Sequence, residues 1–433
     1  MRKNIFVLGL EHFNLAILES MPRADEYEFI GLLDYEEIVR PERVRLPESL
    51  AKAEEQLVSF SGSVDAIVGY WDFPTSSILP LLRRRFGLPT TSLEAVLKCE
   101  HKYWSRLEQQ RAVAEHVPRF CAFDPFDDDP LSKIDLEFPF WIKPIKAHSS
   151  YLGFKIRHRE DFQTAIRIIR DKIDLFGEPF NQVLSEAALP PEIAGIGGYH
   201  CIAEAVISAG RQCTLEGYAL GGEVEVYGVI DSVREGEHRS SFSRYQYPSR
   251  LPRRVQERMV EAARRLVLHI GYDGSPFNVE FYWNDRTDEI ALLEINARIS
   301  KSHCPLFEEV DGSSHQQVMI DIALRQRPRF PRRKGCHRLA GKFMLRVFHD
   351  GIVARVPDAT DIRRLRTIFP DARVRVIAHE GMRLSELRLQ DSYSFEVAEI
   401  FLGARDQKQL LENYRRAVEV LNFRFEPLRP EAA

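Results

Sequence analysis

Three residues with oxygen-bearing side chains, Glu280, Glu294 and Asn296, lie close together in the sequence at a spacing that could bind a metal ion. From Phe277 to Trp283 apolar and polar residues alternate, which is the two-residue period of a half-buried strand. A turn rich in Asn and Asp follows, and the run from Ile290 to Ile295 predicts a second strand. Residues two apart share one face of a strand, so a tight hairpin can bring the three side chains onto one face.

Oxygen ligands alone suit a hard cation, and a site with few carboxylates suits Mg²⁺ shared with phosphate oxygens better than zinc. Arg298 adds a fixed positive charge two residues after Asn296. The alternative is a hairpin whose polar face only points to water. A carboxylate at Glu294, within the apolar run ALLEIN, would be costly to bury unless it is paired or metal-bound, and this favours the metal site.

Two lysines could hold phosphate. Lys102 lies on a helix predicted to follow Ser92, and Lys143 ends an apolar strand just before Pro144. The loop 147–153, with small and polar residues, follows Lys143, and its N–H groups could act with the ammonium group as phosphate donors. The alternative for this segment is a surface β-hairpin.

The bulk composition is that of an ordinary globular protein. The 433 residues are enough for two or three domains, with 44% hydrophobic and 29% charged residues. A formal net charge of -4 gives no general attraction to nucleic acid or to an anionic membrane. The first apolar run is interrupted at Glu11 and His12 and no later segment could span a membrane, which predicts a cytoplasmic protein. Six cysteines without CxxC spacing predict reduced thiols.

Strand and helix signals alternate over the first hundred residues, which predicts a parallel sheet with helices on both faces. Only one glycine, Gly9, ends the first strand, so a dinucleotide fingerprint is absent. We expect irregular structure over 177–199 and a loop over 239–254. The Pro- and Arg-rich run 327–335 predicts a solvated joint rather than a phosphate or nucleic-acid site, and a small α+β domain follows it.

The two lysines, the segment IAEAVISAGRQ and above all NVEF followed by LLEINARIS resemble the ATP-grasp superfamily, of the biotin carboxylase-like and amino-acid ligase-like type. The resemblance covers nearly the whole chain and implies an α/β and α+β architecture. It implies an N-terminal Rossmann-like domain over 1–98, a two-part ATP-grasp domain over 99–330 with a lid at about 138–218, and a C-terminal α+β domain over 331–433.

The resemblance also implies roles for single residues. Glu280, Glu294 and Asn296 would bind Mg²⁺, for which Mn²⁺ is an alternative, and Arg298 would contact phosphate or an acyl-phosphate. The residues that would hold ATP are Lys102 and Lys143 on the phosphates, Ser149, Ser150 and Gly153 in the closing loop, Glu204 and the backbone near Ile207 at the adenine, and Gln212 at the ribose. Gln212 replaces an acid found in many members, and His148 and Tyr151 replace glycines of the loop.

The implied activity is ATP-dependent ligation, in which a small-molecule carboxylate becomes an acyl-phosphate that an amine, such as an amino acid, attacks. His303 could orient the substrate or act as the base, although a residue in that place is also typical of a helix start or a core. Two alternatives stay open: an enzyme that activates bicarbonate, and an ATP-binding protein without turnover. A homodimer through the N-terminal domains is expected by analogy alone.

Overall fold

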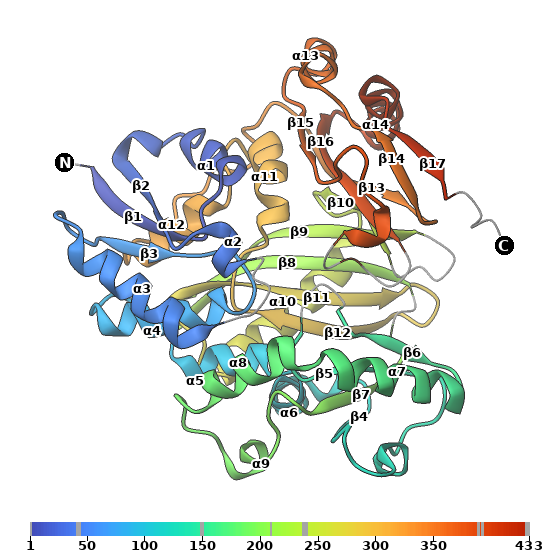
Figure 1. Cartoon of the computed structure of the whole chain (residues 1–433). Helices are drawn as coiled ribbons and strands as arrows, with labels where there is room; N and C mark the ends of the chain where they lie inside the picture. The colour runs from blue at the N-terminus through green and yellow to red at the C-terminus, as the bar shows by residue number, and fades with distance from the viewer. Residues whose placement is uncertain are drawn as a thin grey trace. The chain divides into compact units, whose positions relative to one another are not determined.

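The computed structural model describes residues 2–39, 45–147, 151–207, 210–235, 241–387, 390 and 394–428 (Figure 1). The chain forms two compact units, which are described separately below. The first unit consists of Met1–Gly228, Leu251–Lys301 and Gln316–Arg329, and the second of Val229–Arg250, Ser302–His315 and Phe330–Ala433.

The first unit begins with a parallel three-stranded sheet in the order β2-β1-β3, drawn in blue in Figure 1. This confirms the parallel sheet that the alternation of signals predicted. Gly9 follows β1 with a φ of 62°, in the left-handed region that glycine adopts without strain. The elements of this part are β1 (Lys3–Leu8), α1 (His12–Glu19), η1 (Ala24–Glu26), β2 (Tyr27–Leu32), α2 (Tyr35–Ile38), α3 (Leu46–Ser59), β3 (Ala66–Val68) and α4 (Thr75–Arg85).

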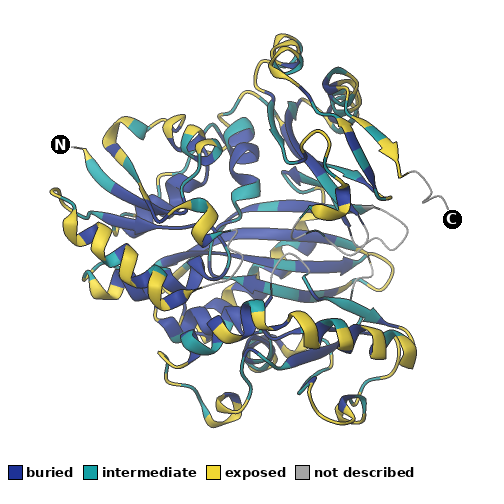
Figure 2. Cartoon of the chain, in the orientation of Figure 1, coloured by how far each residue is buried: buried dark blue, intermediate teal, exposed yellow. Residues whose placement is uncertain are grey.

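An antiparallel sheet in the order β4-β7-β5-β6 follows in the same unit. Figure 2 shows its neighbouring helix α7 exposed on its outward side, as its amphipathic sequence requires. The elements here are α5 (Leu93–Glu100), α6 (Lys102–Val113), η2 (Ala114–His116), β4 (Phe120–Phe123), η3 (Pro130–Lys133), β5 (Phe140–Pro144), β6 (Phe154–Ile156), α7 (Arg159–Lys172), α8 (Asp174–Leu184), α9 (Pro191–Ala194) and β7 (Cys201–Ala205).

The expectation of irregular structure over 177–199 is wrong, because α8 and α9 occupy much of it. Pro191 is the first residue of α9, a position where its missing N–H costs nothing. Gly177 lies within α8 where a Cβ would come within 3.1 Å of the Gly198 carbonyl oxygen. Here Pro and Gly serve a helix start and a close backbone contact rather than a loop.

The third part of the first unit carries the strands of the expected metal hairpin, in the order β12-β11-β8-β9. Helix α10 packs on β11, and the residues of β11 that alternate with the polar face, Phe277, Val279 and Phe281, are fully buried. The elements are β8 (Arg211–Leu220), β9 (Glu223–Glu235), whose later residues belong to the second unit, α10 (Arg253–His269), β11 (Ser275–Asn284), β12 (Glu289–Asn296) and α12 (Gln316–Ala323).

The second unit contains the end of β9 and continues in the order β9-β10-β13-β16-β15, with a separate pair β14-β17. Helices α13 and α14 pack their apolar residues on β13 and β16, as in the small α+β domain that was predicted. The remaining elements are β10 (Ser241–Tyr247), η4 (Lys301–His303), α11 (Cys304–Asp311), β13 (Leu339–Val347), β14 (Gly351–Arg355), α13 (Ala359–Ile368), β15 (Arg373–Val376), η5 (Leu384–Glu386), β16 (Phe395–Ala404), α14 (Gln407–Leu421) and β17 (Arg424–Pro427).

The expectation of a loop over 239–254 is wrong for β10. Arginine side chains lie over aromatic rings here, with Arg234 3.7 Å from the centroid of Phe242 and Arg244 5.7 Å from that of Phe343. Such cation–π contacts let basic residues take part in a sheet. The six cysteines are free in the structure, and the reduced state of their thiols stays a prediction. Among the described helices, none has the length and apolar character needed to cross a membrane.

Helix α10 provides a matched test of this packing. Leu266 is fully buried and Leu268, two residues further on, has 49% of its surface exposed. We expect Leu266→Ala to lower the free energy of unfolding of the first unit by about 2–5 kcal/mol through lost burial and a cavity. Leu268→Ala should change it by less than about 0.5 kcal/mol. Urea denaturation followed by tryptophan fluorescence measures both, and equal midpoints would contradict the packing of α10.

Candidate active site

The hairpin β11–β12 brings the expected metal-binding residues together. Its register places Glu280 opposite Glu294 and Asn278 opposite Asn296. Residues 278 and 280, like 294 and 296, share one face because they are two apart. The structure therefore gathers Glu280, Glu294 and Asn296 on one face, with Asn278 as a fourth polar residue.

Hydrogen bonds fix the orientation of this group. The Asn296 amide nitrogen donates to the Asn278 side-chain oxygen at 2.9 Å, and the Asn278 amide nitrogen donates to the Arg298 carbonyl oxygen at 3.2 Å. The Gln212 amide donates to a Glu280 oxygen at 2.7 Å. Since its nitrogen is used within the sheet, Asn296 can offer its carbonyl oxygen as a ligand. Two carboxylates and one amide oxygen form a donor set that fits Mg²⁺.

A further carboxylate on the neighbouring strand, Glu216, was missed by the sequence analysis. It lies opposite Asn278 in the register of β8 with β11 and is fully buried, and the Ser300 backbone N–H donates to it at 3.2 Å. Burial raises its pKa well above the usual range, against the opposing charge of Arg298. The signal was present in the sequence, because Gln212, Thr214 and Glu216 follow the same two-residue period as the hairpin.

Arg298 is held by an acidic residue from the N-terminal part of the chain. Its Nε and Nη2 atoms donate to one Asp72 oxygen at 2.8 and 2.6 Å. Burial by itself would lower the pKa of Arg298, but the carboxylates of Asp72, Glu216 and Glu294 together outweigh it and the pKa is raised. The guanidinium therefore stays charged beside the hairpin.

Glu204 is the anionic centre of the lysine side of the site. The Lys143 Nζ atom lies 2.6 Å from one of its oxygens, and the Arg106 Nε atom lies 2.6 Å from the other. Burial alone would raise the pKa of Glu204, but Arg106 and Lys143 outweigh it and lower the pKa to about 2. Glu204 is thus a carboxylate at any ordinary pH.

Lys102 begins α6, and its Nζ atom donates to the Ala147 carbonyl oxygen at 2.5 Å. Burial, together with the neighbouring charge of Lys143, lowers its pKa to about 8, while Glu294, Glu204 and Asp72 oppose this. These opposing charges link the lysines electrostatically to the metal hairpin.

A third lysine, Lys146, was not predicted as part of the site. It forms a buried ion pair with Glu100, and its Nζ atom lies 5.3 Å from the centroid of the Phe73 ring. Burial lowers its pKa to about 8, against the charges of Asp72 and Glu294. The site is therefore more cationic than the two expected lysines indicate.

Arg106 is another residue that the sequence analysis missed. Besides Glu204, it donates from Nη1 to the Leu292 carbonyl oxygen and from Nη2 to the Leu293 carbonyl oxygen, both at 2.8 Å. The side chain is 2% exposed. Arg106 thus ties α6 and β7 to the stretch of β12 that immediately precedes Glu294.

The other expected residues stand as follows. Ser149 and Ser150 lie outside the described residues. Gly153 directly precedes β6, and Ile207 follows β7, both half-buried. His303 belongs to the second unit, where it is buried and meets the Tyr245 ring edge-on at a centroid distance of 5.0 Å. The residues above all lie in the first unit.

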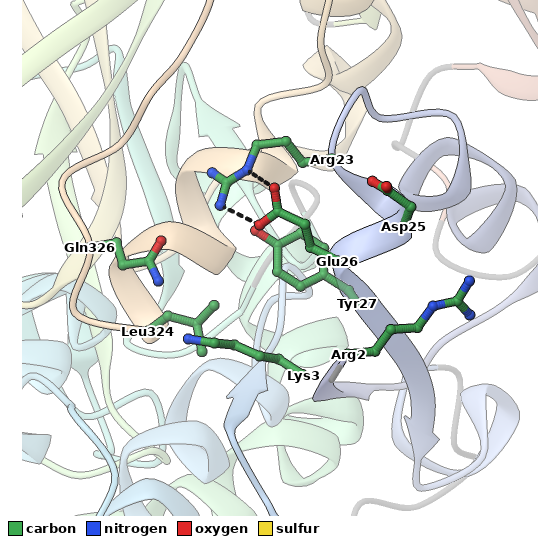
Figure 3. A pocket seen from close by; sticks show the side chains of 8 residues that line it. All are labelled: Arg2, Lys3, Arg23, Asp25, Glu26, Tyr27, Leu324 and Gln326. Atoms are coloured by element: carbon green, nitrogen blue, oxygen red, sulfur yellow. Dashed lines mark hydrogen bonds and ion pairs between the residues drawn. The ribbon is translucent and has the colours of Figure 1, made fainter.

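A cavity of about 340 Å³ lies elsewhere in the first unit (Figure 3). Two of its charged groups are paired with each other, because Arg23 donates to both oxygens of Glu26, and Arg23 also donates to Asp321. None of its lining residues belongs to the candidate site. They are Arg2, Lys3, Arg23, Asp25, Glu26, Tyr27, Leu324 and Gln326.

The chain is similar to one family model and to solved structures. The family model described as "Carbamoyl-phosphate synthase L chain, ATP binding domain" matches residues 246–328, which include the whole hairpin β11–β12. No curated protein matches the chain. Solved structures of similar fold cover almost its full length, and the chain has the ATP-grasp fold that its motifs predicted.

One similar structure is the L-amino acid ligase from Bacillus licheniformis, with a TM-score of 0.69, 14% identity and 99% coverage of both chains. A second is N5-carboxyaminoimidazole synthase from Aspergillus clavatus in complex with ADP and 5-aminoimidazole ribonucleotide, with a TM-score of 0.65, 14% identity and coverage of 97% and 99%. A third is the biotin carboxylase domain of 2-oxoglutarate carboxylase from Hydrogenobacter thermophilus with MgADP, ADP and bicarbonate, with a TM-score of 0.61, 15% identity and coverage of 98% and 91%.

Arg106 can be tested against an exposed arginine of the same helix. Arg106→Met leaves Glu204 buried with Lys143 as its remaining cation among the described residues, and should lower the free energy of unfolding by about 3 kcal/mol. Arg111 is 45% exposed and pairs with Glu108 and Glu192. Arg111→Met should lower the free energy of unfolding by less than about 1 kcal/mol. Urea denaturation of both variants is the measurement. Equal stability of the two would show that the buried network contributes nothing.

The lowered pKa of Lys102 predicts a pH dependence. The unfolded chain keeps this proton up to about 10.5 and the folded chain up to about 8, so the Lys102 contribution to stability rises with pH between these values. Over the same window its positive charge is lost, and affinity for MgATP should fall by up to about tenfold per pH unit.

The variant Lys102→Arg keeps its charge and should show a shallower fall in MgATP affinity, measured by calorimetry from pH 7 to 9.5. Lys146 titrates near the same pH, so the slope should decrease without vanishing. Lys98→Arg is the control. Lys98 lies on α5, the helix before α6, and donates to the Ile270 carbonyl oxygen. If the MgATP affinity of Lys102→Arg fell with pH as steeply as that of Lys98→Arg, loss of the Lys102 charge would not be a cause of the fall.

Proposed function

We propose that this chain is an ATP-dependent ligase that activates a small carboxylate as an acyl-phosphate for attack by an amine. The observation that carries the proposal is the hairpin face with Glu280, Glu294 and Asn296, coupled electrostatically to the buried lysines Lys102 and Lys146. Phosphoryl transfer needs cationic groups and positioning more than covalent chemistry from the protein, and this set of residues supplies both.

Glu280, Glu294 and Asn296 would hold Mg²⁺, with Mn²⁺ as a second ion of suitable chemistry. When bound, the ion would neutralise charge on the phosphate oxygens. The oxygen-only donor set supports this assignment, as does the MgADP bound in the biotin carboxylase domain of similar fold.

Different residues of this chain would contact the phosphates, the adenine and the ribose of ATP. Lys102 and Lys143 would donate to the phosphates, and the loop with Ser149, Ser150 and Gly153 would close over them. Glu204 and the backbone at Ile207 would meet the adenine. Gln212 would hydrogen-bond the ribose hydroxyls through the amide donor and acceptor sites that the bond to Glu280 does not use.

Arg298 would contact the transferring phosphoryl group, held in place by Asp72. The γ-phosphoryl group would pass from ATP to the substrate carboxylate, releasing ADP. The amine would then attack the carbonyl carbon and expel phosphate, and one proton would have to leave the amine. We retain His303 as the candidate for orienting the amine or accepting this proton, on the evidence of its place in the sequence.

The three-domain division into 1–98, 99–330 and 331–433 is part of the proposal, with closure of the segment at about 138–218 excluding water. An amino acid is the proposed amine, which the similarity in fold to the L-amino acid ligase supports. A homodimer is also proposed, since the biotin carboxylase domain of similar fold is a dimer.

Phosphate release from MgATP tests the activity. Pools of amino acids and small carboxylic acids should stimulate release, and splitting the active pool names the substrates. Stimulation by bicarbonate alone would favour the bicarbonate-activating alternative. Stabilisation of the fold by MgATP without release in any pool would favour an ATP-binding protein without turnover.

Two glutamates of β12 provide a matched pair. Glu294→Gln should lower stimulated phosphate release about 100-fold or more, because one of the two carboxylates that would hold Mg²⁺ loses its charge. Glu289 is exposed on the same strand and accepts a bond from Thr287, so Glu289→Gln should leave the rate unchanged. The rate is read with a coupled phosphate assay. An active Glu294→Gln variant would overturn the assignment of the metal site.

A further inference from the structure

A second group of potential metal ligands lies in the second unit. The His337 Nε2 atom is 3.2 Å from a Glu309 oxygen and 3.2 Å from an Asp371 oxygen. All three ligand atoms lie within 4.8 Å of one another. The group shares no residue with the candidate active site.

The backbone fixes each of the three residues. The His337 N–H donates to the Glu309 carbonyl oxygen at 2.9 Å, and the Gly335 N–H donates to the Val310 carbonyl oxygen at 3.0 Å, so this segment is attached to α11. On its other side, the Arg338 N–H donates to a carbonyl of β16 at 3.2 Å. Asp371 lies in the turn between α13 and β15. Three separate segments therefore present one ligand each.

Strand β16 has a glycine where the imidazole ring lies. A Cβ atom at Gly403 would be 2.1 Å from His337 Cδ2 and 2.6 Å from its Nε2 atom. No side chain could occupy that space with the ring in its present position. The glycine thus makes room for the ring.

The two distances from the His337 Nε2 atom match the separation of ligands around a small tetrahedral ion. With metal–ligand bonds of about 2.0 Å, two ligand atoms of a tetrahedron are about 3.3 Å apart. One imidazole nitrogen and two carboxylate oxygens suit zinc, and three protein ligands leave a position for water. Glu309 is 10% exposed, His337 27% and Asp371 53%, so an ion could enter from the side of Asp371.

The charges of the group favour a cation. The nearby Arg373 donates to both oxygens of Glu308, at 2.6 and 2.8 Å, rather than to Glu309. A single imidazole thus lies between two carboxylates.

We propose that Glu309, His337 and Asp371 bind one divalent transition-metal ion of the zinc type. The ion would connect α11, the segment 335–338 and the turn before β15, and would stabilise the second unit as a structural site. This site shares no ligand with the Mg²⁺ site of the proposed function. It also contains an imidazole, whereas a hard cation such as Mg²⁺ prefers oxygen ligands alone.

The test uses the full chain without an affinity tag, stripped with a chelator and then titrated with ZnCl₂ in excess Mg²⁺. We expect one Zn²⁺ per chain by calorimetry and a higher melting temperature in its presence. His337→Gln and Asp371→Asn should each weaken binding about 10–100-fold or more and remove the thermal shift, because each removes a direct ligand. Asp371 is the more exposed of the two, so Asp371→Asn keeps the test valid if the histidine variant does not fold.

Two controls isolate the site. His379→Gln changes an exposed histidine of the same unit, and Cys336→Ser removes the exposed thiol next to His337. Both should bind Zn²⁺ like the original chain. Absence of Zn²⁺ binding in the original chain, unchanged binding in His337→Gln and Asp371→Asn, or loss of binding in Cys336→Ser would each overturn the proposal.

Discussion

The candidate active site depends on one buried carboxylate, Glu204, whose charge two cations neutralise. Without Arg106 and Lys143, a carboxylate at this depth would take up a proton, and the strands β5 and β7 would lose the attraction that holds them to α6. Arg106 extends the same network to the backbone of β12. The position of the metal hairpin relative to the lysines therefore follows from a requirement of electrostatics as much as from apolar packing.

The hairpin itself follows from the two-residue period of its strands. Val279 and Phe281 are fully buried, so Asn278 and Glu280 must turn to the other face, and a slip of one residue would bury the carboxylate. The register of β11 with β12 is irregular between Glu280 and Phe281. Glu280 is the last residue of β11 in the candidate site, so the irregularity begins where the site ends. On that face, Gln212 and Glu216 of β8 complete a polar surface three strands wide.

Local pattern explains which features were predictable. The facing of Glu280, Glu294 and Asn296 follows from periodicity within a short window, and the resemblance carried by the motifs indicated the ATP-grasp fold. Arg106 and Asp72 were missed because their partners lie 98 and 226 residues away, and nothing in a short window reveals such a contact. Strand β10 was missed for another reason, since arginine is typical of a loop until aromatic rings cover it.

The cations of the site already have partners: Lys143 has Glu204, Lys146 has Glu100 and Arg298 has Asp72. On the proposed function, a triphosphate would not meet unpaired charges but would share cations whose positions the protein's own carboxylates have fixed. Fixing them in advance costs folding stability, which the lowered pKa values of Lys102 and Lys146 express. Cations that are already in position need not be reorganised when charge develops on the transferring phosphoryl group. Electrostatic stabilisation of this kind is usually the largest contribution to the rate of such an enzyme. The stability lost in burying these lysines is therefore the cost that a ligase of this kind would require.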